Sequence, residues 1–361
     1  MSDTLRYYLG FNLIPGIGPL RLARLIEHCG SVTAAWHASD MAMAAAGLDS
    51  RSIAGLKAAR QTLDLDAELS RLHAAGVTPL SIADPAYPPL LRMIPAPPPL
   101  LYLRGAITPA DQRAIAIVGT RHPSPYGREA TRRIARDLAA AGLTIVSGLA
   151  LGIDTIAHTA ALEANGRTIA VLASGVDRIY PERNRALAQQ IAAVGALVSD
   201  YPLGTPPAPL NFPPRNRIIA GLSLATLVVE AGAQSGALLT VQFALDQGRD
   251  VLAVPGSIFN PLSIGPHQLI RDGAAIVTSA RDVLDVLNLA SCNTMDESPL
   301  ELALTPEEEA IYRVVAAEPQ HIDVIGRAAN QSAAATAAAL ALLELKGLVR
   351  QVVPLYYARG R

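Results

Sequence analysis

The feature that most constrains the fold of this chain is a unit that recurs through its middle. Each unit has a short apolar run, a pair of small residues and then a stretch with helical spacing. In the first unit, Ala114 to Val118 is followed by Gly119-Thr120-Arg121, and apolar residues return at helical spacing from Gly127 to Ala141. Such a run is typical of a buried parallel strand. The unit therefore predicts alternating strands and helices.

Four further apolar runs repeat this pattern. They cover residues 143–146, 168–173, 225–229 and 250–254, and the small pairs after them are Ser147-Gly148, Ser174-Gly175, Ser235-Gly236 and Pro255-Gly256. Right-handed crossovers make such strands parallel, so all five loops should emerge at the same carboxyl edge, where open α/β sheets bind ligands. We therefore predict an α/β fold whose core is a Rossmann-like, mostly parallel sheet.

The segment from Phe212 to Arg217 predicts an anion pocket at this edge. Its two prolines mark the start of a helix, so Arg215 and Arg217 lie in a first turn. Cations there oppose the helix dipole by about 0.3 to 1 kcal/mol each. An anion bound between these arginines, Arg121 and the strand-end loops would compensate, because helix N-termini favour phosphate and carboxylate.

Two residues near this pocket have alternative roles. Glu230, directly after a strand, could be a general base, or it could fix the side chains of Arg215 and Arg217, and the second role fits better. Phe212 could stack on a nucleic-acid base or anchor its loop in the core. Tyr126 and Tyr180 are weaker stacking candidates.

Several classes of site lack support in the sequence. There is no Gly-Lys pair for a P-loop and no complete GxSxG elbow. Asp154 and His158 lie four apart but have no third ligand, so a helix cap at Asp154 and an intrahelical pair are favoured, and we expect no metal. Cys29 and Cys292 are too far apart in sequence to suggest a disulfide framework or a zinc site. We see neither a secretory signal nor a membrane span, and we expect a cytoplasmic protein.

The charge balance limits how the chain could bind nucleic acid. With 30 basic and 31 acidic residues, the net charge is -1. A diffuse basic surface is therefore absent, and affinity would have to come from a local group of arginines and backbone donors.

At 361 residues the chain should hold two or three domains. Residues 1–75 predict short helices broken at Gly10, Gly16, Gly18, Gly30 and Gly47, with a turn at 15–18 like that of a helix-hairpin-helix or SAM-like domain. Residues 76–112 form a proline-rich connector in which Leu100 to Leu103 is a possible edge strand. The Rossmann-like domain covers 113–290, and 291–304 has linker composition.

Residues 305–361 predict a small winged-helix module. Thr305 and Glu308 form a capping box for a first helix through Ala317, and two more helices and a hairpin follow. The third helix, 332–346, has no basic residue before Lys346. A protein contact is therefore favoured over sequence-specific reading of duplex DNA.

The motifs of the middle segment, in this order, resemble the DprA family of DNA-processing proteins of bacterial natural transformation. They are IVGTR at 117–121, SGLALGID at 147–154, AVLASGVDRIYP at 170–181, FPPRNRIIAGLS at 212–223, VVEAGAQSGALLT at 228–240 and AVPGSI at 253–258. Departures are few: Asp200, Ala237 and His267 stand where the family usually has Glu, Ser and Asn.

The resemblance implies a core that binds and protects single-stranded DNA and loads the RecA recombinase, with neither catalysis nor a cofactor. It also implies a homodimer, for which the surface around Leu269 and Ile270 is our candidate. With the strand-end argument, it gives the expected DNA- and phosphate-binding residues: Gly119, Thr120, Arg121, Ser147, Gly148, Phe212, Arg215, Asn216, Arg217, Ser235 and Gly236.

Two rival functions stay open. A Rossmann-like hydrolase of nucleoside phosphates could use the same anion pocket with Glu230 as its base. The C-terminal module could instead make the chain a regulator that binds duplex DNA.

Overall fold

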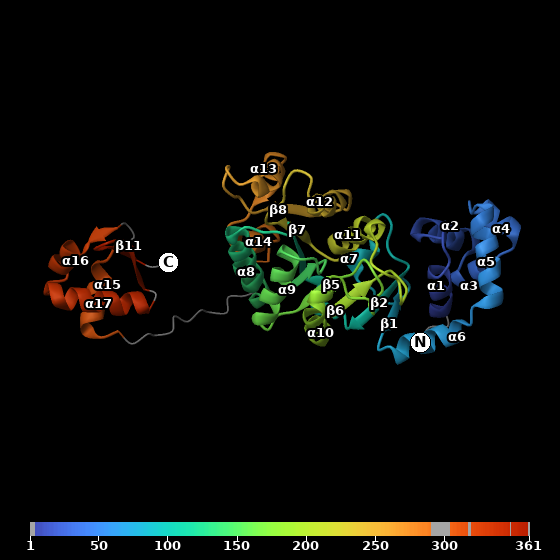
Figure 1. Cartoon of the computed structure of the whole chain (residues 1–361), viewed down its shortest axis with the longest axis horizontal. Helices are drawn as coiled ribbons and strands as arrows, with labels where there is room; N and C mark the ends of the chain where they lie inside the picture. Colours follow the sequence, from blue (N-terminus) through green and yellow to red (C-terminus); the bar gives the residue numbers. More distant parts are fainter. Residues whose placement is uncertain (1–3, 290–303, 317–318, 347, 360–361) are drawn as a thin grey trace. The chain divides into compact units, whose positions relative to one another are not determined.

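The computed structural model describes residues 4–289, 304–316, 319–346 and 348–359. The chain divides into two compact units, Met1–Cys292 and Asn293–Arg361, coloured from blue to gold and in orange-red in Figure 1. Among the described residues no helix is both long and apolar enough to cross a membrane.

A nine-stranded sheet forms the centre of the first unit, in the order β1-β2-β6-β5-β4-β3-β7-β8-β9. The strands β3 to β9 are parallel, whereas β2 is antiparallel to both β1 and β6. Their bounds are β1 Thr78–Ser81, β2 Leu100–Gly105, β3 Ala114–Val118, β4 Thr144–Ser147, β5 Thr168–Val171, β6 Ala196–Ser199, β7 Ala225–Val228, β8 Asp250–Ala253 and β9 Ala275–Ile276. The predicted mostly parallel sheet is confirmed.

Helices cover both faces of this sheet. On one face, Ile115 and Ile117 pack in a cluster with α8 (Pro125–Ala140), α9 (Ile153–Glu163) and α14 (Ala280–Val286). On the other, Ala116 and Val118 pack in a cluster with α7 (Pro89–Arg92), α11 (Phe212–Gly221) and α12 (Ala237–Asp246). Both faces are buried, which explains why the strands read as continuous apolar runs.

The other helices of this sheet domain are α10 (Arg185–Val194) and α13 (Ile264–Arg271). Four short 3-10 turns are also present among its described residues: η1 Pro109–Gln112, η2 Glu182–Asn184, η3 Pro209–Asn211 and η4 Pro261–Ser263.

The N-terminal segment is helical, and its core continues into the β2 side of the sheet. Its helices are α1 Leu5–Asn12, α2 Pro19–Cys29, α3 Val32–Trp36, α4 Asp40–Ala45, α5 Ser50–Thr62 and α6 Leu65–Ala74. Leu9, Phe11 and Trp36 share one buried cluster with Tyr102 of β2. The predicted break at Gly10 is wrong, because Gly10 lies inside α1. A Cβ at this position would lie 2.6 Å from the Trp36 ring, so glycine permits close packing here.

The strands outside the five predicted apolar runs differ from the prediction. Leu100–Gly105 pairs on both sides, with β1 and with β6, so it is an interior strand. The edge position belongs to β1, and the proline-rich segment between the two strands carries α7. Strands β1, β6 and β9 were not predicted. Strand β6 has only four residues, and Gly195 alone separates it from the preceding helix, which ends at Val194.

The second unit has a winged-helix arrangement, as predicted. Its elements are α15 Pro306–Val314, β10 Gln320–His321, α16 Ile322–Ala328, α17 Ala333–Leu345, β11 Val349–Val353 and β12 Tyr356–Arg359. The capping box of Thr305 and Glu308 is present. The first helix ends at Val314, earlier than expected.

Candidate nucleic-acid interface

A cleft of about 610 Å³ lies at the carboxyl edge of the parallel strands. Its position follows from the strand order, because β4, β5 and β6 are added on one side of β3 and β7, β8 and β9 on the other, so the order of winding reverses at β3. Open α/β sheets bind ligands at such switch points. The predicted residues that line the cleft are Gly119, Thr120, Arg121, Phe212, Arg215, Asn216, Ser235 and Gly236, joined by His122, Ala150, Asp154, Tyr180 and Thr240.

Three helices present their N-termini to this cleft. Ala150 and Asp154 lie at the start of α9, Phe212 and Pro213 at the start of α11, and Ala237 at the start of α12. Each N-terminus carries about half a positive charge. Because three such ends meet a cationic side chain in one hollow, the cleft favours an anion.

Arg215 forms the floor of the cleft. Its side chain is buried, and its Nη1 donates to the carbonyl of Gly148 at 2.8 Å and to that of Val171, while Nε donates to Asn216 Oδ1. Burial lowers the pKa of Arg215 to about 10, and nearby Asp154 opposes this change. The guanidinium therefore remains charged at pH 7.

Phe212 and Arg121 form the accessible side of the cleft. The Phe212 ring is half-buried, and the guanidinium carbons of Arg121 and Arg215 lie 5.8 and 5.9 Å from its centroid. The Tyr180 ring lies 5.9 Å away. These distances suit cation–π and aromatic contacts. Arg121 is exposed, so a bound anion can reach it without a change in the fold.

The structure places three predicted site residues elsewhere. Arg217 points away from the cleft, where its guanidinium donates to Asp200 Oδ2 at 2.7 Å and to the Ala96 carbonyl at 2.5 Å. Ser147 is fully buried and donates its hydroxyl to Ile117. The Gly148 carbonyl accepts from Arg215. We therefore correct the expectation of an anion held between Arg215 and Arg217.

Glu230 does not fix either arginine, contrary to the expectation. Its carboxylate accepts from the backbone N–H and hydroxyl of Ser124 and from the side-chain amide of Asn260. It is buried, with 1% exposure. Its role is to hold the loop before α8 against the end of β7.

Asp154 lines the cleft, which the sequence reasoning missed because it treated this residue as a helix cap or a metal ligand. Its carboxylate accepts from the N–H groups of Gly148 at 3.1 Å and Ala150 at 3.3 Å. Burial raises the pKa of Asp154, and Arg215 and these N–H groups oppose that change. Its position directly after a strand-end loop was the sequence signal that could have placed Asp154 in the cleft.

His158 is buried one helical turn after Asp154. Thr168 donates its hydroxyl to the Ile145 carbonyl, so it accepts the Nδ1 proton of His158 at 2.6 Å. Burial, followed by the charge of Arg215, lowers the pKa of His158 to about 3. The described residues contain no group of His, Cys, Asp and Glu that could hold a metal.

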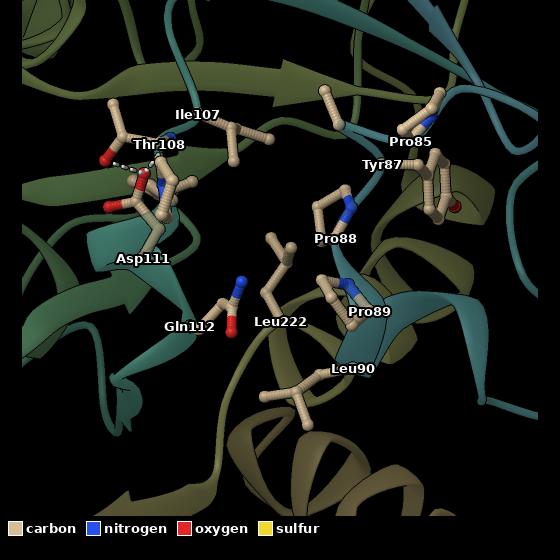
Figure 2. A pocket seen from close by; sticks show the side chains of 13 residues that line it. Pro85, Tyr87, Pro88, Pro89, Leu90, Ile107, Thr108, Asp111, Gln112 and Leu222 are labelled. Carbon is tan, nitrogen blue, oxygen red and sulfur yellow. Dashed lines mark hydrogen bonds between the residues drawn. The ribbon is translucent and has the colours of Figure 1, made fainter.

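A smaller pocket, of about 160 Å³, lies at the opposite, amino edge of the sheet (Figure 2). Its walls are mostly apolar, from Pro88, Pro89, Leu90, Ile107 and Leu222. It offers little for an anion to bind.

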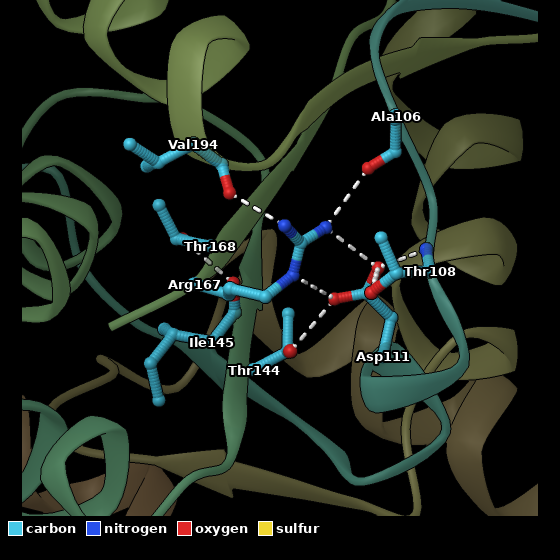
Figure 3. Close-up of polar contacts among 8 residues, drawn as sticks. All are labelled: Ala106, Thr108, Asp111, Thr144, Ile145, Arg167, Thr168 and Val194. Atoms are coloured by element: carbon cyan, nitrogen blue, oxygen red, sulfur yellow. Dashed lines mark hydrogen bonds and ion pairs between the residues drawn. The ribbon is translucent and has the colours of Figure 1, made fainter. Parts of the chain in front are cut away.

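The polar groups beside this smaller pocket are already engaged (Figure 3). Arg167 donates to both carboxylate oxygens of Asp111 and to the carbonyls of Ala106 and Val194. Asp111 also accepts from the hydroxyl of Thr144 and from both the N–H and the hydroxyl of Thr108. These contacts link segments next to β2, β3, β5 and β6, so this edge stabilises the sheet.

Two family models match the chain. The first, described as DNA recombination-mediator protein A, matches residues 78–288, and the second, the DprA winged helix domain, matches residues 295–353. The protein Smf of Synechocystis is 36% identical over 98% of this chain and 98% of its own length.

Two solved structures are also similar. The X-ray structure of DNA processing protein A from Streptococcus pneumoniae has a TM-score of 0.70 and 36% identity, and the match covers 78% of this chain and 97% of that one. A structure of DNA processing protein A from Helicobacter pylori, described for its single-stranded DNA binding mode, has a TM-score of 0.53 and 30% identity. It covers 59% of this chain and 95% of that one.

Proposed function

Because the chain belongs to the DprA family of DNA recombination-mediator proteins, we propose that its carboxyl-edge cleft binds single-stranded DNA. The observation that carries this proposal is the pairing of an exposed cation, Arg121, with the half-buried ring of Phe212 in one hollow. A phosphate would bind Arg121 and the helix N-termini, and the adjoining base would stack on Phe212.

The same arrangement favours a single strand over a duplex. A base can reach Phe212 only if it is unpaired, because the bases of a duplex are stacked inside the helix. Stacking on an aromatic ring contributes about 1 to 3 kcal/mol per base and tolerates any sequence. The near-zero net charge of the chain leaves little general attraction to duplex DNA.

We propose a mediator role in natural transformation for this chain, as a homodimer in the cytoplasm that protects single strands and passes them to RecA. The similarity to DNA processing proteins supports this role. We propose no catalytic step. The rival hydrolase would need Glu230 as a base, and the buried Glu230 carboxylate already accepts from Ser124 and Asn260 and does not line the cleft.

For the winged helix we propose a protein contact. The third helix ends near Lys346, and its ammonium group lies 2.7 Å from a carboxylate oxygen of Glu308. The cation expected on this helix is therefore engaged within its own module. Affinity for duplex DNA relies on Lys and Arg side chains that contact phosphates, and residues 333–345 of this helix contain neither.

The test is fluorescence anisotropy with a labelled oligothymidylate and with a duplex, for the wild type, Arg121→Ala and Arg51→Ala. Arg51 is an exposed arginine of α5 and serves as a control of equal charge. We expect single-strand binding that weakens at least tenfold in Arg121→Ala and is unchanged in Arg51→Ala. Equal binding by all three proteins, or a preference for duplex, would contradict the proposal.

A further inference from the structure

Helix α8 carries four exposed arginines on the face that points away from the sheet. Its inner face is buried through Thr131, Ile134, Ala135 and Leu138. The outer face holds Arg128, Arg132, Arg133 and Arg136, which we call the arginine stripe. Residues 128, 132 and 136 follow one another at a spacing of four, so they form a row along the helix.

The stripe is only partly neutralised. Arg132 pairs with Glu129 at 3.2 Å and Arg136 with Asp137 at 2.9 Å, and both arginine side chains are 55% exposed. Within the described part of the chain, Arg128 and Arg133 form no ion pair. Exposed pairs of this kind contribute little to stability, so a phosphate can replace their carboxylates at low cost. In a chain with net charge -1, this face is a local excess of positive charge.

The stripe follows the cleft directly along the chain. Arg121 lines the cleft, Ser124 caps the N-terminus of α8, and Arg128 follows in the first turns of the helix. The exposed Tyr126 lies between them. Residues four apart on a helix are about 6 Å apart along its axis, which is similar to the separation of successive phosphates in an extended strand.

We propose that the arginine stripe binds the phosphate backbone of the strand after it leaves the cleft. This inference rests on the proposed function of the cleft. The stripe offers cations but no aromatic ring beyond Tyr126, so it would follow the backbone without reading bases. Strands long enough to leave the cleft would bind more tightly than strands that the cleft alone can hold.

The experiment compares two triple variants of the full chain. The first is Arg128→Ala, Arg132→Ala, Arg136→Ala. The control is Arg51→Ala, Lys57→Ala, Arg71→Ala, on α5 and α6. Each set removes three exposed cations, two of which are ion-paired, since Lys57 pairs with Asp40 and Arg71 with Glu68. Alanine preserves the helices.

Binding is measured across a salt series, with a short oligothymidylate that the cleft can hold and with one several times longer. For the stripe variant we expect weaker binding of the long strand only. The slope of log K against log salt should become shallower by about 2, because each lost contact to a single strand removes about 0.7. The control variant should match the wild type.

The possible outcomes separate the two proposals. If the stripe variant binds the long strand as the control does, or loses affinity for both strands equally, the stripe is not a second binding tract. If the wild type binds neither strand, the proposed function of the cleft fails, whatever the stripe does.

Discussion

Arg215 and Arg217 lie two positions apart on α11 and reach opposite sides of the helix. Arg215 extends to the carbonyls of Gly148 and Val171 at the strand ends, whereas Arg217 extends to Asp200 and Ala96. The helical repeat requires this, since residues two apart do not face each other. The helix was predicted correctly from the sequence. The prediction did not consider that Arg215 and Arg217 lie on different faces of it, so both were expected in one pocket.

This difference predicts separate effects of two arginine substitutions. Arg217→Ala leaves the carboxylate of Asp200, whose side chain is only 16% exposed, without its cation, so we expect a loss of about 3 kcal/mol in the free energy of unfolding. Arg121→Ala should leave that free energy nearly unchanged and should lower the salt dependence of single-strand binding. Urea unfolding and salt-dependent anisotropy measure the two effects. A shallower salt slope in folded Arg217→Ala would show that Arg217 contacts phosphate.

Two glycines of the cleft region predict another contrast. A Cβ at position 148 would lie 2.8 Å from the guanidinium of Arg215, whereas a Cβ at position 236 would meet no atom within 4 Å. We expect Gly148→Ala to displace Arg215, to destabilise the protein and to weaken binding. Gly236→Ala should preserve stability or raise it by about 0.4 to 1 kcal/mol. Thermal unfolding compares them, and equal effects would contradict this account of Gly148.

Elements differ in how well their sequences predict them. The five strands with apolar runs were recognised because burial on both faces leaves few polar residues in them. The pairing of Leu100–Gly105 with β6 was not predictable, because local spacing carries no information on partners so far away. The paired residues lie between 91 positions apart (Gly105 with Ala196) and 97 positions apart (Tyr102 with Ser199). The contacts of Glu230 with Ser124 and Asn260 likewise depend on strand order.

The contact between α9 and β5 predicts a dependence of stability on pH. Folding keeps His158 neutral, with a pKa of about 3 against 6.5 in the unfolded chain. The unfolded chain therefore binds more protons in this window, and stability falls as the pH drops below about 6.5, by up to about 1.4 kcal/mol per pH unit. In His158→Asn the number of protons taken up on unfolding should be smaller by about one, so the free energy of unfolding should change less with pH. Urea unfolding of both proteins between pH 4 and 7, about the range in which His of the unfolded chain titrates, measures this difference. Identical slopes of the free energy of unfolding against pH would contradict the assignment of the effect to His158.

At the scale of the whole molecule, the cleft belongs entirely to the first compact unit. All of its lining residues lie between Val118 and Thr240. The winged helix has a separate core, formed by Ile311, Ile325, Leu340 and Leu343 with their neighbours. Two units with separate cores should fold independently.

We therefore predict that residues 1–292 fold alone and bind single-stranded DNA as tightly as the full chain. Circular dichroism and anisotropy on this fragment, with residues 293–361 as the comparison, measure both properties. The shorter fragment should fold without binding the strand. A large loss of affinity in residues 1–292 would assign part of the binding to the winged helix.

The wide spread of the cleft along the chain also matters during synthesis. Its walls come from the segments after β3 and β4, from the start of α11 and from the start of α12, which ends at Asp246. A nascent chain on the ribosome lacks a complete cleft until the last of these segments has emerged and β4 and β7 have paired with the two sides of β3. If the cleft binds single strands as proposed, unfinished chains should therefore lack this site, and the topology of the sheet alone would delay binding until synthesis has passed α12.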